Sequence, residues 1–282
     1  MAGAAGKLYV VATPIGNLED ITLRALRVLK EADLIAAEDT RRTRKLLSHY
    51  SIATPMVSYH AHSPASRAEE LMERLRAGAK VALVSDAGTP GFSDPGADLV
   101  ARAWEAGVKV EAVPGPAAAV AALSVSGFKG DVTFVGFLPR GAGRRVKLLQ
   151  ELAAEARVLI IFESPRRAAR TLAEIAEMMP HRRVLVVREL TKKFEEAWRG
   201  PAAQVAAQLA GADLKGEVAL VLSCPEVQAA RVVDLKAHLL AAARETGFTG
   251  RRLAEAVAAE LQVPRRRAYQ AYLALKDQKQ IN

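Results

Sequence analysis

The chain has 282 residues, of which 50% are apolar and 25% charged, and its 40 Lys and Arg against 31 Asp and Glu give a formal net charge of +9. Its single cysteine cannot form an internal disulfide, and its longest apolar stretch, residues 112–125, is too short and too interrupted by proline and glycine to cross a bilayer. These features exclude a secreted, membrane-spanning, fibrous or disordered protein, and we expect a soluble protein of the cytoplasm.

Short runs rich in Val, Ile and Leu alternate with longer amphipathic stretches, a pattern typical of parallel α/β structure. A first series of strands is expected at residues 8–13, 33–38, 56–60, 80–86 and 108–113, with helices between them such as 21–32 and 66–77. After a linker expected at residues 126–130, a second series follows at 131–137, 157–163, 182–188 and 216–222. Because the runs are almost continuously apolar, helices should cover both faces of each sheet.

Beyond residue 225 the pattern changes to three short helices, expected at 234–245, 250–261 and 264–276. Residues 231–282 contain 10 Lys and Arg but 5 Asp and Glu, so this segment carries more than half of the net charge. The sequence therefore predicts two α/β domains, at residues 1–128 and 129–228, and a basic helical module at 229–282.

Three loops rich in proline and glycine follow predicted strands, at residues 13–17, 86–96 and 114–118. Ligands of open parallel sheets bind at the carboxyl ends of the strands, and glycine lets the backbone approach a ligand closely. These loops predict a binding cleft, although Asp94 and Pro95 also have the form of a simple helix start. The chain contains neither G-x-G-x-x-G nor a Walker A sequence, so an ordinary dinucleotide site or P-loop has no support.

The segments TPIGNLEDIT (13–22), EDTRRT (38–43), SDAGTPGFSDPG (85–96) and PGPAA (114–118) resemble the tetrapyrrole methylase superfamily. FESPRR (162–167) and the basic C-terminal helices resemble its ribosomal RNA branch, the 16S rRNA (cytidine) 2′-O-methyltransferases. The resemblance implies two αβα domains that hold S-adenosylmethionine in the cleft between them, in a homodimer. By the same resemblance, the cofactor-binding residues are Ile15, Gly16, Asp86, Gly88, Thr89, Gly91, Phe92, Ser93, Pro114, Gly115, Pro116, Ala117, Ala118, Phe162, Val218 and Ala219.

A ribose hydroxyl is a poor nucleophile, so a positioned base would accelerate its methylation. The candidates are Glu38, Asp39, Glu163 and Glu189, and for each of them a purely structural pairing with a nearby arginine carries more weight. Lys192 and Lys193 offer a different role, the neutralisation of developing negative charge. The five histidines have no companion cysteines or carboxylates at ligand spacing, and we expect no metal.

Basic clusters favour a polyanionic partner. The predicted RNA-binding residues are Arg41, Arg42, Arg44, Lys45, Arg140, Arg144, Arg145, Arg166, Arg167, Arg265, Arg266 and Arg267. Any one cluster alone would be explained as a solvated surface, and the C-terminal module, which resembles a helix-turn-helix, would equally suit a contact with a second subunit.

The hypothesis that follows is 2′-O-methylation of a cytidine of 16S rRNA near the decoding centre, on naked rRNA or on the assembled small subunit. One alternative is a tetrapyrrole C-methyltransferase of the same superfamily, which would need neither the basic clusters nor the C-terminal module. The other is a DNA-binding regulator that uses residues 231–282 to bind DNA and the rest of the chain to sense a ligand.

Overall fold

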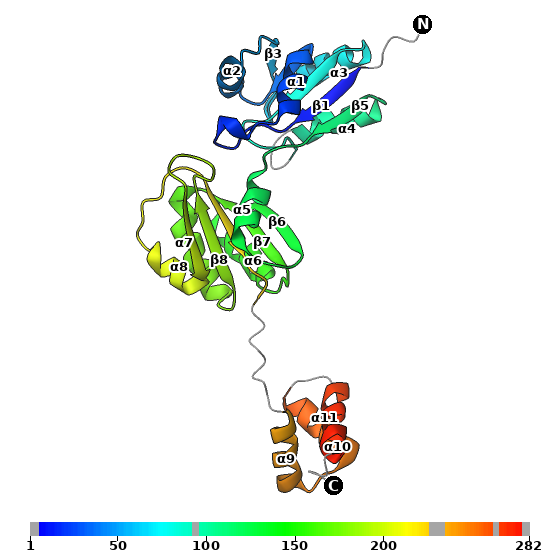
Figure 1. Ribbon diagram of the computed structural model, residues 1–282, viewed down its shortest axis with the longest axis vertical. Helices are drawn as coiled ribbons and strands as arrows, with labels where there is room; N and C mark the ends of the chain where they lie inside the picture. The colour runs from blue at the N-terminus through cyan, green and yellow to red at the C-terminus, as the bar shows by residue number, and fades with distance from the viewer. Residues whose placement is uncertain (1–5, 92–95, 226–234, 262–264, 278–282) are drawn as a thin grey trace. The chain divides into compact units, whose positions relative to one another are not determined.

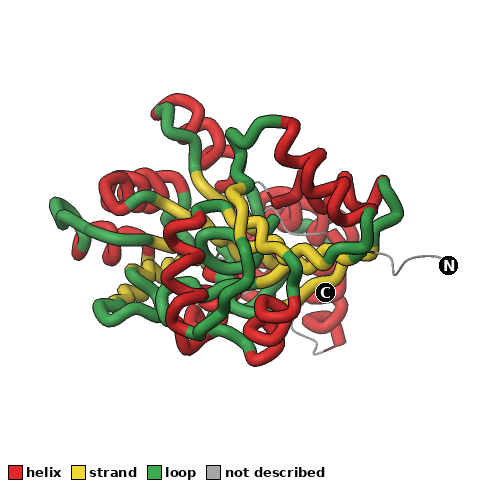
Figure 2. The backbone as a smooth tube through the Cα atoms, turned by 90° about the horizontal axis from the view of Figure 1, so that it is seen from above, coloured by secondary structure: helices red, strands yellow, loops and turns green. Residues whose placement is uncertain are grey.

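A computed structural model describes residues 6–91, 96–225, 235–261 and 265–277 (Figure 1). The chain divides into two compact units, Met1–Pro225 and Glu226–Asn282. The larger unit contains two five-stranded sheets, and helices flank the strands (Figure 2). We call the part built on the first sheet, residues 6–113, the first lobe, and the part built on the second sheet, residues 118–225, the second lobe.

The first sheet is parallel throughout, with the strand order β3-β2-β4-β1-β5. Its strands are β1 (Lys7–Val11), β2 (Leu34–Ala37), β3 (Met56–Ser58), β4 (Lys80–Val84) and β5 (Lys109–Val113). Its helices are the short 3-10 helix η1 (Leu18–Asp20), α1 (Leu23–Glu31), α2 (Thr40–His49), α3 (Ala65–Arg76) and α4 (Gly96–Glu105).

Successive residues of each strand in the first sheet enter opposite cores, as the pleat of a strand requires. Leu8 packs with α3 and α4 on one face, whereas the adjacent Tyr9 packs with α1 and α2 on the other. The expectation of a parallel sheet covered on both faces is confirmed for this lobe.

The second sheet is mixed, with the order β6-β7-β10-β8-β9. Its strands are β6 (Val132–Phe137), β7 (Val158–Glu163), β8 (Arg183–Arg188), β9 (Glu196–Pro201) and β10 (Val218–Leu222). Only β6 and β7 are parallel, and the other three neighbouring pairs are antiparallel. The expectation of parallel structure is therefore wrong for this lobe, and β9 was not predicted, because its sequence EAWRGP is polar and ends in Gly-Pro at the edge of the sheet.

Helices cover both faces of the second sheet as well. One face packs against α6 (Ala142–Ala153), α7 (Pro165–Met178) and α8 (Ala202–Gln208), and the other against α5 (Ala118–Ser126). The predicted boundary after residue 128 assigns α5 to the first domain, yet its buried Ala119 and Ala122 lie on the second sheet. The chain thus passes from one lobe to the other before α5.

The C-terminal unit has its own core. Its helices α9 (Leu235–Thr246), α10 (Gly250–Glu260) and α11 (Arg265–Asp277) begin within one residue of the predicted positions. They bury Leu239, Leu253, Val257, Tyr272 and Leu275 together. The predicted boundary at residues 228 and 229 lies outside the described residues. Within the part of the chain that the structure describes, no helix is long and apolar enough to cross a membrane.

Candidate functional site

The three loops rich in proline and glycine meet at the carboxyl edge of the first sheet. The Thr13 amide donates a hydrogen bond to the Gly88 carbonyl at 2.9 Å, and the Gly88 amide donates one to the Thr13 carbonyl at 3.0 Å. The Thr89 hydroxyl donates to the Pro116 carbonyl at 3.2 Å, which ties in the loop after β5. Gly88 has φ of +80°, a left-handed conformation that glycine adopts without steric cost. The prediction that these loops gather at one sheet edge is confirmed.

Two carboxylates join the end of β2 to the end of β4. Oε2 of Glu38 accepts a hydrogen bond from the Asp86 amide at 3.1 Å, and Oδ1 of Asp86 accepts one from the Asp39 amide at 2.9 Å. Asp39 caps α2 by accepting from the Arg41 amide, and its hydrogen bonds from the Arg41 side chain lower the pKa of its carboxyl. These residues fix the shape of the loops before any ligand binds.

The second lobe brings three further strand ends to the site. Because β10 is antiparallel to both β7 and β8, Val218 near its start pairs with Glu163 at the end of β7 and with Arg188 at the end of β8. Val218 and Ala219 therefore lie at the same edge as Phe162, although they begin their strand rather than end it.

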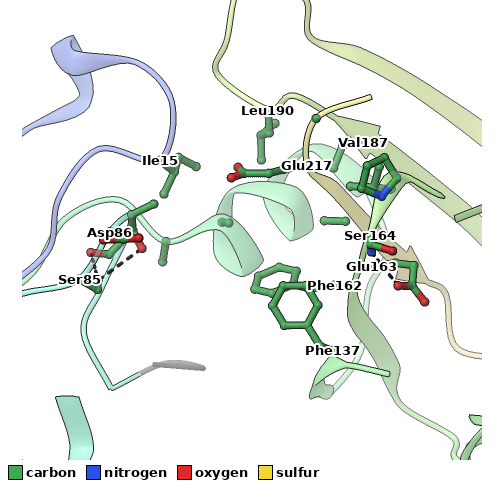
Figure 3. A pocket seen from close by; sticks show the side chains of 18 of the residues that line it. Ile15, Ser85, Asp86, Phe137, Phe162, Glu163, Ser164, Val187, Leu190 and Glu217 are labelled. Carbon is green, nitrogen blue, oxygen red and sulfur yellow. Dashed lines mark hydrogen bonds between the residues drawn. The ribbon is translucent and has the colours of Figure 1, made fainter. Parts of the chain in front are cut away.

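A cavity of about 370 Å³ lies between these edges of the two lobes (Figure 3). Pockets for small molecules have volumes of roughly 300–1,000 Å³ and are mostly apolar with a few convergent polar groups. Ile15, Phe162, Val187 and Leu190 supply apolar walls, and Glu38, Asp86, Glu163 and Glu217 supply carboxylates. The cavity thus has the size and the mixed lining of a site for a small ligand.

The structure places many of the predicted cofactor residues in this lining: Ile15, Asp86, Gly88, Thr89, Ala117, Ala118, Phe162, Val218 and Ala219. The remaining described ones, Gly16, Gly91, Pro114, Gly115 and Pro116, do not line it. Phe92 and Ser93 lie outside the described residues. Gly16 instead faces the second lobe, where an added Cβ would lie 2.5 Å from Cγ of Lys192.

The lining also contains residues that sequence reasoning missed, namely Ser85, Ala87, Phe137, Ser164, Pro165, Val187, Leu190, Gly216 and Glu217. Ser85 and Ala87 lie within the segment SDAGTPGFSDPG, and Ser164 and Pro165 within FESPRR, so the motifs themselves could have indicated them. The others belong to the second lobe, where the direction of the strands decides which end reaches the cavity.

Of the four predicted bases, Glu163 is fully buried. Its carboxylate accepts hydrogen bonds from the Ser164 amide at 2.6 Å, from Nε of Arg167 at 2.8 Å and from the Thr171 hydroxyl at 2.9 Å. Its side chain is 0% exposed. The arginine pairing weighed for this residue from the sequence is therefore present, and its oxygens are occupied.

Glu189 lies beside the cavity rather than in its lining. Its Oε1 accepts hydrogen bonds from Nζ of Lys192 at 2.8 Å and from the Glu217 amide at 2.9 Å, and the bond from Lys192 lowers the pKa of its carboxyl. Burial lowers the pKa of the Lys192 amine, but its hydrogen bonds and charge contacts with Glu189 and Glu217 outweigh burial and raise it. Glu189 and Thr191 both have positive φ, so this loop is held in a strained conformation beside the cavity.

Nine of the twelve predicted RNA-binding residues have exposed side chains. Those whose side chains reach the surface are Arg41, Arg42, Arg44, Lys45, Arg140, Arg144, Arg166, Arg265 and Arg266, and Arg42 also lines the cavity. Arg167 is engaged by Glu163 and by the carbonyls of Leu138 and Pro139. Arg267 belongs to α11, but its side chain is outside the described part.

The expectation that Arg145 contacts RNA is corrected by its burial. Arg145 is 2% exposed, and its guanidinium binds both carboxylate oxygens of Glu174, at 2.7 and 2.8 Å. It joins α6 to α7 inside the second lobe. In the described ranges, no three residues of the His, Cys, Asp and Glu types gather as a metal site would require.

Comparison with known proteins agrees with this geometry. A family model, tetrapyrrole (corrin/porphyrin) methylases, matches residues 7–206. The chain belongs to this family. A relative from Synechocystis, named ribosomal RNA small subunit methyltransferase I, is 44% identical over 96% of the chain and 99% of its own length. One of the same name from Thermotoga maritima is 48% identical over 78% of the chain and 100% of its own length.

Solved structures of tetrapyrrole methylases share the fold. Cobalt precorrin-4 methyltransferase aligns with a TM-score of 0.58 at 18% identity, over 77% of this chain and 94% of its own. Uroporphyrin-III C-methyltransferase from Thermus thermophilus, solved in complex with S-adenosyl homocysteine, aligns with a TM-score of 0.56 at 22% identity, over 77% of this chain and 97% of its own.

Proposed function

We propose that this protein is an S-adenosylmethionine-dependent methyltransferase that acts on ribosomal RNA of the small subunit. The observation that carries the proposal is the 44% identity, over nearly the whole chain, with a relative named for this activity. The specific acceptor that we propose is the 2′-hydroxyl of a cytidine of 16S rRNA near the decoding centre. We further propose that the enzyme works in the cytoplasm as a homodimer, on naked 16S rRNA or on the assembled small subunit.

The residues of the cavity fit the proposed cofactor. Gly88 presents bare backbone at the wall, the apolar side chains suit an adenosine, and Glu38, Asp86 and Glu217 outnumber Arg42, which suits a cationic sulfonium. The bound cofactor supplies an electrophilic methyl group. We propose that the lining residues predicted from the sequence hold it, and that Gly16, Gly91, Phe92, Ser93, Pro114, Gly115 and Pro116 support or extend this site.

The chain's own contribution to the reaction is to bring the hydroxyl to the methyl in line and to exclude water, which can supply about 7–11 kcal/mol of the barrier. Among the four predicted bases, we retain Glu38 as the candidate that receives the proton of the hydroxyl. It lines the cavity and keeps part of its surface exposed, whereas Glu163 is buried and Asp39 and Glu189 are outside the lining.

The surface arginines and lysine of α2, together with Arg140, Arg144, Arg166 and the C-terminal Arg265 and Arg266, are the proposed contacts to RNA phosphates. Of these residues, Arg42 lines the cavity, and Arg265 and Arg266 lie on the separate basic unit. Contacts between basic side chains and phosphates strengthen RNA binding, and we propose that methyl transfer takes place in the cavity.

The test is transfer of tritiated methyl from S-adenosylmethionine to three acceptors offered separately: small subunits, naked 16S rRNA and a precorrin-type tetrapyrrole. The RNA should come from cells that lack this protein, so that the target is unmodified. Label on a cytidine ribose would support the full proposal, and label on another RNA position would refute the cytidine 2′-O assignment. Label on the tetrapyrrole alone, or preferred binding to a duplex DNA operator without any label, would overturn the RNA methyltransferase itself.

A further inference from the structure

Phe137 is an aromatic side chain that the second lobe leaves in water beside the cavity. It ends β6, it lines the cavity, and it is 62% exposed (Figure 3). A single exposed apolar side chain is common on a protein surface, but this ring also lines the cavity, where a bound partner can reach it.

Aromatic packing holds the ring of Phe137 in position. It packs edge-to-face on Phe162, with ring centroids 5.6 Å apart and planes at 62°, and Phe162 packs in the same way on Phe134 at 5.2 Å and 73°. Phe162 in turn lies against the core between α5 and the second sheet. Such arrangements are favoured between aromatic rings, so they hold Phe137 in place while the rest of its surface remains open.

The backbone that carries Phe137 is fixed as well. Phe137 is in register with Phe162 in the parallel pair of β6 and β7. The next two carbonyls, of Leu138 and Pro139, accept hydrogen bonds from the Arg167 guanidinium at 3.1 and 3.2 Å. A ring on such a rigid base loses little conformational freedom when a flat partner stacks on it.

Three exposed arginines of the second lobe lie close in the sequence to Phe137 or to Phe162, on which it packs. Arg140 follows Phe137 by three residues, Arg144 lies in the first turn of α6, and Arg166 lies in the first turn of α7, directly after β7. All three are exposed, and within the described ranges none of them forms an ion pair. Their sequence neighbours Arg145, Arg167 and Arg170 differ, because each is paired with Glu174 or Glu163.

We propose that Phe137 is the platform on which an unpaired base of the substrate RNA stacks, with Arg140, Arg144 and Arg166 contacting the phosphates that flank it. Proteins recognise single-stranded RNA by stacking its bases on aromatic side chains while arginines contact its backbone. Because the ring and the proposed cofactor share one cavity, a base on Phe137 brings its own ribose toward the methyl group. This inference rests on the proposed function and adds the residue that orients the acceptor.

The experiment compares Phe137→Ala, Phe137→Leu and Phe137→Trp with the wild-type protein in methyl transfer to unmodified small subunits. Loss of one stacked base is expected to raise the KM for RNA roughly 5- to 150-fold in the Ala and Leu variants. The Trp variant, which restores a stacking face, should stay within about threefold of wild type. The dissociation constant for S-adenosylmethionine, measured by calorimetry, should not change in any of them.

Trp104→Ala is the matched control, because Trp104 is an aromatic side chain of similar exposure, 64%, on α4 and outside the cavity lining. It should leave the KM for RNA unchanged. Since Phe137 is mostly exposed and loses only its packing on Phe162, its variants should still be folded at the assay temperature, and thermal unfolding checks this, so a change in KM would not reflect misfolding.

Three outcomes would overturn the proposal. Weaker cofactor binding with an unchanged KM for RNA would make Phe137 a wall of the cofactor site. An equal loss in the Trp and Ala variants would show that stacking is not its role, and Phe137→Ala with wild-type kinetics would show that it has none. Failure of the wild-type protein itself to label RNA would instead refute the proposed function.

Discussion

The variant Glu163→Gln tests whether the Glu163 carboxylate has a structural or a catalytic role. The side chain is 0% exposed and accepts hydrogen bonds from the Ser164 amide, from Arg167 and from Thr171. Gln keeps the shape of the side chain, but it removes the negative charge that balances Arg167. Its amide NH2 group would also face groups that themselves donate hydrogen bonds. We expect the variant to be less stable and its cofactor site to be otherwise intact.

The size of this effect follows from the burial of the pair. Removing one partner of a buried ion pair costs about 3–5 kcal/mol. Arg167 retains two carbonyl acceptors and its side chain is 24% exposed, so the lower end of that range applies. About 3 kcal/mol corresponds to a fall of roughly 6–12 °C in the unfolding temperature of a domain of this size.

The measurement is thermal unfolding followed by circular dichroism, together with methyl transfer at a temperature where both proteins are folded. Glu217→Gln is the control, because Glu217 lines the same cavity with its side chain 66% exposed. It should change stability by no more than about 0.5 kcal/mol. If Glu163→Gln unfolded like wild type but lost more than about 100-fold in rate, the buried-pair reasoning would be refuted and Glu163 would be a base.

Two further predictions concern the contact between the lobes and the response to pH. Gly16→Ala should weaken S-adenosylmethionine binding about tenfold, because the added methyl group would lie 2.5 Å from Cγ of Lys192. Lys192→Ala in the same chain should relieve this steric clash and restore binding. A calorimetric dissociation constant that is unchanged in the single variant would contradict the prediction. Burial, assisted by Asp98, raises the pKa of Tyr59 to about 12. Below pH ~10 the protonated phenol contributes its full stabilisation, and this stabilisation is lost as the pH rises toward 12. The difference in the free energy of unfolding between wild type and Tyr59→Phe should therefore decrease by about 1–2 kcal/mol between pH ~10 and 12. A constant difference in urea unfolding between pH 9 and 12 would refute it.

The first lobe could be predicted from the sequence because its three inner strands, β1, β2 and β4, are largely buried. Each reads as an almost continuous apolar run, and the helices between them have one apolar side. The second lobe shows what such runs do not indicate: β8 and β10 have the same apolar pattern, yet they run antiparallel to each other in a mixed sheet. Only the contacts of the folded chain decide the direction of a buried strand, and the polar edge strand β9 has no apolar run at all.

The same limit explains which residues of the candidate site could be predicted from the sequence. Loops of the first lobe were predicted by their proline and glycine residues, whereas Gly216 and Glu217 precede a strand whose direction the sequence does not give. Arg145 was wrongly assigned to the surface because the prediction did not consider which side of the helix each residue of the basic run occupies. It lies four residues before the buried Leu149, on the inner face of α6, while Arg144 is one position away and points out.

The strand order has a consequence for how the chain folds during synthesis. In the first sheet β4 lies between β1 and β2, which are made before it, so this sheet closes when four of its five strands have been made. In the second sheet β10 is made last, yet it lies between β7 and β8. Until Leu222 has left the ribosome, β7 and β8 each present an open, apolar edge, and such edges recruit other chains. The nascent protein therefore exposes both edges throughout translation of the residues between β8 and β10.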